Sequence, residues 1–156
     1  MPAPLVTTTA PAFKTTLLAA LQARPNLAGI QVVSTFPGDT LRPVAVYFGH
    51  TTATVVPPVM AGSRIKRQET YLVEVYIDVC DGSNDVFKAE AAAYGIMGEL
   101  DECLAADATQ GNAGGSAQQI IDSWIASWES RPYVDDTRQG WAALLKVEVQ
   151  VRARLR

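Results

Sequence analysis

Two runs in this sequence alternate strictly between apolar and polar residues. In the first, from Glu69 to Cys80, every second residue from Tyr71 to Val79 is apolar. In the second, from Leu145 to Leu155, the apolar positions again follow a period of two, with charged or polar residues between them. A period of two predicts long β-strands that each bury one face.

Two other stretches have the period of a helix. Residues 9–23 predict a helix that begins at Thr9 as its cap. Residues 85–107 predict a longer helix whose apolar stripe lies on the sheet. Gly95 and Gly98 lie inside the longer helix and cost about 1 kcal/mol each relative to alanine, so we expect the backbone to pack closely there. The stripe consists of Val86, Ala89, Ala93, Ile96, Met97, Leu100 and Leu104.

Shorter signals predict three more strands. Residues 30–36 and 44–49 are rich in β-branched and aromatic residues and are separated by a Pro-Gly-Asp turn, which predicts a hairpin. Residues 119–129 predict a further strand that carries Trp124 and Trp128 on one face.

Two segments are expected to be loops. Residues 51–68 predict a long flexible loop, because Pro57-Pro58 is expected to end any strand there. Residues 108–117 predict a Gly-rich loop. The whole chain, 1–156, then forms one domain of the α+β class, with a mostly antiparallel sheet of about five strands and two helices packed on one face.

Composition indicates a folded, soluble protein. Hydrophobic residues make up 48% of the chain and charged residues 19%, which excludes intrinsic disorder as the general state. The start of the chain lacks a signal peptide and no run reaches the roughly 20 apolar residues of a membrane span, so we expect an intracellular protein with no membrane partner. The net charge of −3 hides an asymmetry. Residues 85–107 are acidic, and residues 138–156 are basic.

The sequence offers no catalytic constellation, so we expect no enzyme, no cofactor and no metal. His50 is the only histidine, and no neighbour in sequence orients it as a base. Cys80 and Cys103 have neither metal-ligand spacing nor enough partners for a disulfide framework. The Gly-rich run has the glycines of a phosphate cradle but no following lysine, so it fails that pattern.

Charged residues remain as the candidates for contacts with partners. Arg64, Lys66 and Arg67 lie in the predicted loop, where either a solvated loop or a docking arm for an acidic partner explains them. Arg152, Arg154 and Arg156 share one strand face, about 7 Å apart. A solvated face, a subunit interface and contact with a phosphate backbone all remain open for these three. For Glu99 and Glu102 on the acidic helix, a solvated face also remains open, beside a place in the lumen or a contact with the basic strand across a subunit interface.

Several segments together carry a resemblance to a known family. They are the helix around Phe13 to Leu21, the hairpin through Phe36-Pro37 and Val44 to Phe48, and the sequences ETYLVEVYIDVC, KAEAAAYGIMGELDECL and GWAALLKVEVQVRARLR. In this order the chain resembles the tail terminator, or tail completion, proteins of long-tailed bacteriophages. The resemblance is one of pattern over some 140 residues, without a diagnostic motif.

The resemblance implies a structural protein of the virion, assembled in the host cytoplasm and located at the head-proximal end of the tail. It implies a homo-oligomeric ring, usually of six subunits, that caps the tail tube, ends its polymerisation and joins it to the head connector. DNA would pass through the lumen without sequence-specific binding. The implied partners are therefore the tail tube protein and the head-tail connector protein.

Two other functions remain open. A head-tail adaptor or stopper, or a tail tube subunit, shares the sheet-rich ring architecture. A small cytosolic enzyme or ligand-binding domain would instead use His50 and a pocket under the helices.

Overall fold

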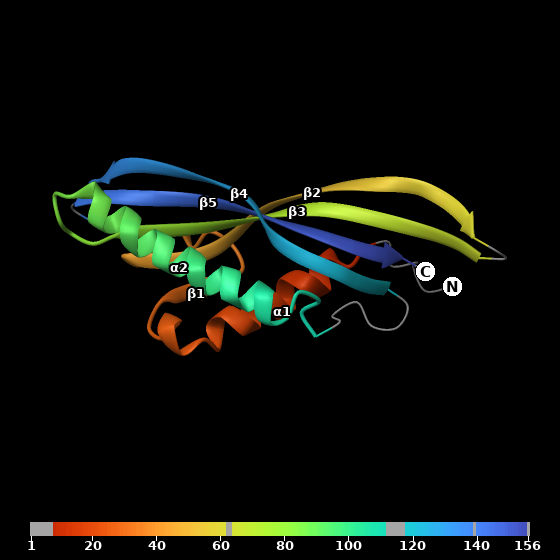
Figure 1. The fold of residues 1–156 in the computed structure, drawn as a ribbon. Helices are drawn as coiled ribbons and strands as arrows, with labels where there is room; N and C mark the ends of the chain where they lie inside the picture. Colours follow the sequence, from red (N-terminus) through yellow and green to blue (C-terminus); the bar gives the residue numbers. More distant parts are fainter. Residues whose placement is uncertain (1–7, 62–63, 112–117, 139, 156) are drawn as a thin grey trace.

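The computed structural model describes residues 8–61, 64–111, 118–138 and 140–155. Figure 1 shows one long, strongly twisted sheet with both helices on the same side of it. This arrangement confirms the predicted α+β class and the mostly antiparallel sheet of five strands. The elements in chain order are α1 (Ala10–Gln22), the 3-10 turn η1 (Pro25–Leu27), β1 (Gln31–Val33), the 3-10 turn η2 (Gly38–Thr40), β2 (Val44–Ala61), β3 (Arg64–Cys80), α2 (Val86–Ala106), β4 (Gln118–Asp135) and β5 (Gly140–Leu155).

The strands lie in the order β1-β2-β3-β5-β4. The three long pairings are antiparallel, but β1 pairs with β2 in parallel, from Gln31 opposite Ala45 to Val33 opposite Tyr47. The predicted hairpin between these two strands is therefore wrong. Residues 34–43, which include η2, carry the chain back to the end of β1 where it began, and a return of this kind produces parallel rather than antiparallel neighbours.

The predicted loop over residues 51–68 is also wrong. β2 continues to Ala61 and β3 begins at Arg64, so the segment is a long antiparallel hairpin. Its register shifts between Val56 and Val59, where Pro57 and Pro58 lie. β1 covers β2 only as far as Tyr47, so both prolines lie on an edge strand, where a missing N–H breaks no ladder on the outer side.

The predicted alternation of β3 and β5 forms the core. The side chains of Tyr71, Val73, Val75, Ile77 and Val79 are at most 1% exposed, and those of β5 from Leu145 to Ala153 on the same face are fully buried. We call this side of the sheet the helix face, because both helices pack on it. From α1 it receives Phe13, Leu17 and Leu21, and from α2 it receives Ala89, Ala93, Ile96, Leu100 and Leu104.

A buried carboxylate fixes the start of α1 on β3. Glu69 is 1% exposed, and its Oε1 accepts hydrogen bonds from the Thr9 backbone N–H at 2.7 Å and the Thr9 hydroxyl at 2.8 Å. The Thr9 hydroxyl also lies 2.9 Å from the Tyr71 hydroxyl. Thr9 is the N-cap residue, but its side chain makes no capping bond within the helix. Glu69 therefore supplies the negative group that a helix N-terminus favours.

Gly95 and Gly98 do not mark a close approach of backbones, contrary to the prediction. A Cβ atom built at either position would meet nothing within 4 Å. We expect Gly95→Ala to raise the free energy of unfolding by about 1 kcal/mol and the melting temperature by roughly 2–4 °C. Gly49→Ala is the contrasting variant, because its Cβ would collide with the Tyr76 ring. Thermal unfolding followed by circular dichroism measures the melting temperature of both variants. A melting temperature of Gly95→Ala below that of the wild type would contradict the prediction.

Candidate functional site

Large apolar side chains are exposed mainly along one edge of the sheet. β4 is the last strand in the order, and none of the described residues pairs with its outer side. Five of the seven exposed large apolar side chains in the described part of the chain lie on β4 or directly opposite it on β5. Exposed apolar side chains that gather along an unpaired sheet edge indicate an interaction surface. Its members are Ile121, Trp124, Trp128, Val134 and Trp141.

Two bulges decide which way these side chains point. The register of β4 against β5 shifts between Ile120 and Asp122 and again between Ile125 and Ser127. Trp124 lies opposite Gln150 and thus on the open face, the side of the sheet that carries Glu74, Tyr76 and Lys146. Trp128 lies opposite Val147 and thus on the helix face. The prediction that both tryptophans share one face is wrong, because the extra residue at a bulge moves all later residues to the other face.

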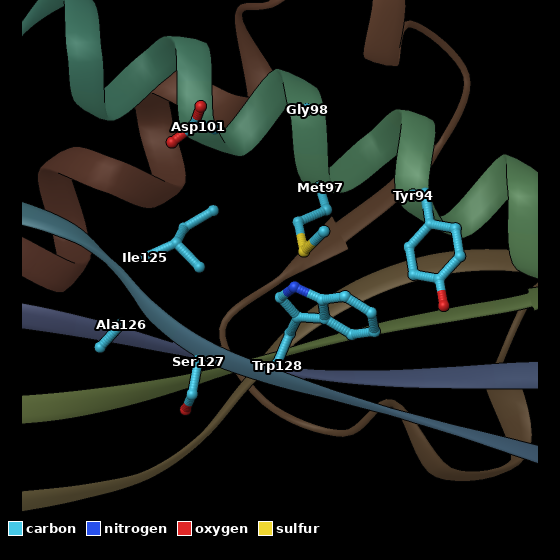
Figure 2. A pocket seen from close by; sticks show the side chains of 8 residues that line it. All are labelled: Tyr94, Met97, Gly98, Asp101, Ile125, Ala126, Ser127 and Trp128. Carbon is cyan, nitrogen blue, oxygen red and sulfur yellow. The ribbon is translucent and has the colours of Figure 1, made fainter.

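A groove of about 510 Å³ runs between α2 and β4, and we call it the edge groove. Figure 2 shows Tyr94 and Met97 pointing from α2 toward the indole of Trp128. The rings of Tyr94 and Trp128 meet edge to face, with centroids 5.1 Å apart. Trp128 nevertheless remains 51% exposed. The lining residues are Tyr94, Met97, Gly98, Asp101, Ile125, Ala126, Ser127 and Trp128.

The polar groups of the edge groove are few. The Tyr94 hydroxyl donates to Glu90 Oε1 at 2.5 Å, and this hydrogen bond raises the pKa of Tyr94. Asp101 lines the groove from α2. The groove thus offers apolar and aromatic surface beside the unpaired outer edge of β4, which suits a protein segment as its occupant.

Arg152 belongs to the same edge of the sheet, on the open face. Its guanidinium lies 5.5 Å from the centre of the Trp124 ring and its Nε donates to Asp122 Oδ1 at 2.8 Å. This hydrogen bond lowers the pKa of Asp122. Arg154 is exposed on the same face two residues later. Arg156 lies outside the described residues.

Glu99 and Glu102 lie elsewhere, on the surface of α2 that meets the N-terminal part of the chain. Arg24 bridges the two carboxylates with N–O distances of 2.6 Å to each. Asn26 also donates to Glu99 at 2.7 Å, and these hydrogen bonds lower the pKa of Glu99. The structure therefore does not bring the two glutamates to Arg152 within one chain, and it gives both of them a partner on the same subunit.

Arg64, Lys66 and Arg67 belong to the start of β3, near the tip of the β2–β3 hairpin. Their side chains lie outside the part of the chain that the structure describes. Figure 1 shows this hairpin as an arm that reaches away from the helices.

A buried ionic cluster, which we call the Asp78 cluster, lies on the open face. Asp78 is 3% exposed and accepts from the Tyr133 hydroxyl at 2.7 and 2.8 Å and from Arg138 Nη2 at 2.8 Å. Arg138 also donates to Asp135 at 2.5 Å, and this bond lowers the pKa of Asp135. The third guanidinium nitrogen of Arg138, Nη1, donates to the backbone carbonyl of Arg42 at 3.2 Å. The cluster thus ties the turn between β4 and β5 to β3 and to the segment before β2.

The Asp78 cluster was missed in the sequence. Asp135 accepts from the N–H groups of Thr137 and Arg138, as aspartates in turns commonly do. The available signal was Asp78 itself, a carboxylate between Ile77 and Val79 near the apolar end of β3. Its partner Arg138 lies 60 residues away in sequence and could not be assigned.

Other candidate chemistry is sparse in the structure. His50 is exposed, and its backbone N–H donates to Glu74 at 3.1 Å. Among the described residues, no group of three or more His, Cys, Asp or Glu side chains is placed to hold a metal ion. Neither helix in the described ranges has the length and hydropathy needed to cross a membrane.

No family model matches the sequence, and no curated protein matches it. Among solved structures, the fold is similar to that of a chain in the virion of a native gene transfer agent particle, with a TM-score of 0.55. The two chains are 9% identical, and the match covers 95% of this chain and 98% of the other. At this identity, what the two chains share is the fold, over nearly the whole length of both.

Proposed function

We propose that the protein is a structural component of a phage-like virion. It forms a ring that caps the tail tube, ends tube polymerisation and joins the tail to the head connector. The observation that carries the proposal is the shared fold with a virion chain over almost all of both chains. The proposed location is the head-proximal end of the tail, after assembly in the host cytoplasm.

The exposed apolar edge supports an assembling protein. An 18-residue edge strand with exposed tryptophans on both faces is a liability for a monomer, because it invites pairing with another chain. A ring of identical subunits covers such an edge on every copy if the contact is heterologous and closes. The ring that the family resemblance implies has six subunits.

The charges of the open face support a lumen through which DNA slides. Lys146 contacts Glu74 at 3.3 Å and Glu148 at 3.7 Å. Arg152 pairs with Asp122, and Arg131 lies 3.2 Å from Glu129. Bases that are already paired with acids release few counterions from DNA, so they hold phosphate weakly. This pattern fits passage of DNA without sequence-specific binding.

The β2–β3 arm is the proposed contact with the next ring of the tail. The proposed docking residues for the tube or the connector lie at the start of β3, near the tip of this arm. They are Arg64, Lys66 and Arg67. An arm that makes an axial contact also fits a tail tube subunit or a head-tail adaptor, which are the alternative functions. These alternatives differ from a terminator in what the purified protein assembles into.

Electron microscopy of the purified protein over a wide concentration range, alone and with tail tubes, tests the proposal. We expect single closed rings, and caps on tube ends that prevent elongation when fresh tube subunits are added. The matched control adds the same protein to tubes whose ends are already capped. The images of these tube ends should show no additional density. Long tubes of the protein alone would identify a tube subunit. Protein that neither closes into rings nor binds tube ends would contradict the terminator function.

A further inference from the structure

The sheet has two open edges in the described part of the chain. One is β4, and the other is formed by the short strand β1 and, beyond Tyr47, by β2, which β1 no longer covers there. β2 is 18 residues long and contains no Asp, Glu, Lys or Arg. Natural edge strands carry charges, above all lysine, to prevent pairing with other chains. Proline on an edge strand also opposes pairing, but residues 48–56, between the part that β1 covers and Pro57, have neither charge nor proline. This stretch of the edge is therefore expected to be covered in the assembled state.

We infer that the β2 edge of one copy pairs with the β4 edge of the next copy, so that the sheet continues from subunit to subunit. The inference rests on the proposed ring and names the contact that builds it. Its occupant is a second copy of this chain, bound through a strand ladder and clasped by Trp124 and Trp128.

Strand direction is consistent with this pairing. Three antiparallel steps separate β2 from β4, so the two edges run in opposite directions. A rotation about an axis parallel to the strands leaves strand directions unchanged. The β2 strand of the next copy would then lie antiparallel to β4, which continues the pattern of the long strands within each chain.

The bulge at Ala126 shapes the β4 edge for an added strand. It places Trp124 on the open face and Trp128 on the helix face, so a strand that joins β4 would have one indole available on each face of the sheet. A ladder alone buries little apolar surface, whereas a stable interface covers roughly 1,200 Å² or more in total. The exposed parts of both tryptophans and the adjoining edge groove supply apolar contact that the ladder lacks.

Charge also permits the contact. β4 carries Asp122, Glu129, Arg131 and Asp135. Because the opposite edge strand has no formal charge, pairing sets no like charges against each other in any register. If two copies of β4 paired with each other instead, the charged residues of one strand would lie beside the charged residues of the other.

Complementation of two edge variants tests the inference. The first, Thr52→Lys with Thr54→Lys, places charges on exposed positions of β2 and leaves β4 intact. The second, Trp124→Lys with Trp128→Lys, blocks β4 and leaves β2 intact. The control, Ala91→Lys with Ala92→Lys, adds the same charge on the exposed surface of α2. Circular dichroism verifies that each variant folds, and native mass spectrometry with light scattering gives the oligomeric state.

We expect the wild type and the control to assemble, and each edge variant alone to remain monomeric. An equimolar mixture of the two edge variants should give a one-to-one dimer that grows no further, because it contains a single intact contact. If the β2 variant assembled by itself, two copies of β4 would have to pair with each other, and the inference would be overturned. If the β4 variant assembled by itself, two copies of β2 would have to pair, which would also overturn it. A wild type that remains monomeric at all concentrations also overturns it.

The same experiment separates the inference from the proposed function. Closed rings formed by either edge variant would leave the terminator function standing and overturn the edge pairing. A one-to-one dimer from the mixed variants, together with open-ended tubes from the wild type, would support the edge pairing and contradict the terminator function.

Discussion

Replacement of Arg138 by leucine is expected to lower the free energy of unfolding by about 3 kcal/mol or more, because it removes one partner of a buried ion pair. The Asp78 carboxylate, 3% exposed, would keep only the Tyr133 hydroxyl as a donor from its present cluster. For a chain of this length the melting temperature should fall by roughly 6–12 °C. Urea unfolding monitored by tryptophan fluorescence measures the change.

Arg131→Leu is the matched control. It removes an arginine from the same strand region, but its pair with Glu129 is exposed on both sides. An exposed pair of this kind contributes at most about 1 kcal/mol. If Arg138→Leu cost no more than Arg131→Leu, the buried cluster would not be a determinant of stability. Replacing Asp78 and Arg138 together by leucine should recover part of the loss, since no charge is then left buried.

The dependence of stability on acidic pH is a second measurement, and a change in packing alone would not alter it. The bond from Arg138 lowers the pKa of Asp135 in the folded protein. A lowered pKa contributes stability above the ordinary value of an aspartate, near 4, and this contribution is lost as the pH falls through the folded value. The wild type should therefore lose stability below about pH 4, and Arg138→Leu should lose less over the same range.

Glu69→Ala is expected to cost about 3 kcal/mol, because it leaves the buried N–H of Thr9 without its acceptor and leaves the Thr9 hydroxyl with only the Tyr71 hydroxyl as a partner. The cost arises at the start of α1, so hydrogen exchange should accelerate there before it does in β3. Glu69→Gln retains one carbonyl oxygen that can accept these bonds. It exchanges the other carboxylate oxygen for an amide NH2 group and removes the negative charge near the helix N-terminus, with an effect of about 1 kcal/mol.

The comparison between the two Glu69 variants decides the mechanism. A larger loss for alanine than for glutamine is expected if satisfied hydrogen bonds hold α1 in place. Equal losses in both variants would indicate that charge alone matters. Glu90→Ala is a suitable control, because Glu90 accepts a bond from Tyr94 on the partly exposed side of α2.

The effects of the two buried carboxylates also bear on assembly. Glu69 holds the first helix on β3, whereas Asp78 holds the turn that leads from β4 into β5. Loss of the second contact should therefore loosen the end of the edge strand that carries Val134. Variants of Arg138 are expected to weaken subunit pairing at β4 in addition to lowering stability.

The sequence by itself determined the elements whose signals are local. The period of two in β3 and β5 and the apolar stripe of α2 each follow from which side chains a single strand or helix presents to one side. Tyr71, Val75, Val147 and Leu100 were placed in the core by this reasoning, and all are buried. The predicted class of fold followed from the order of these elements.

Only the tertiary structure decided the features that depend on pairing between distant segments. The bulges of β4 arise in its register with β5, and they separate Trp124 from Trp128. β2 continues through Pro57-Pro58 because it lies at an edge of the sheet. The sequence of β2 alone does not determine that it occupies this position. Arg24 reaches Glu99 across 75 residues of sequence. Contacts of this kind are selected by packing of the whole chain, since local periodicity carries no information about which strand or side chain becomes the neighbour.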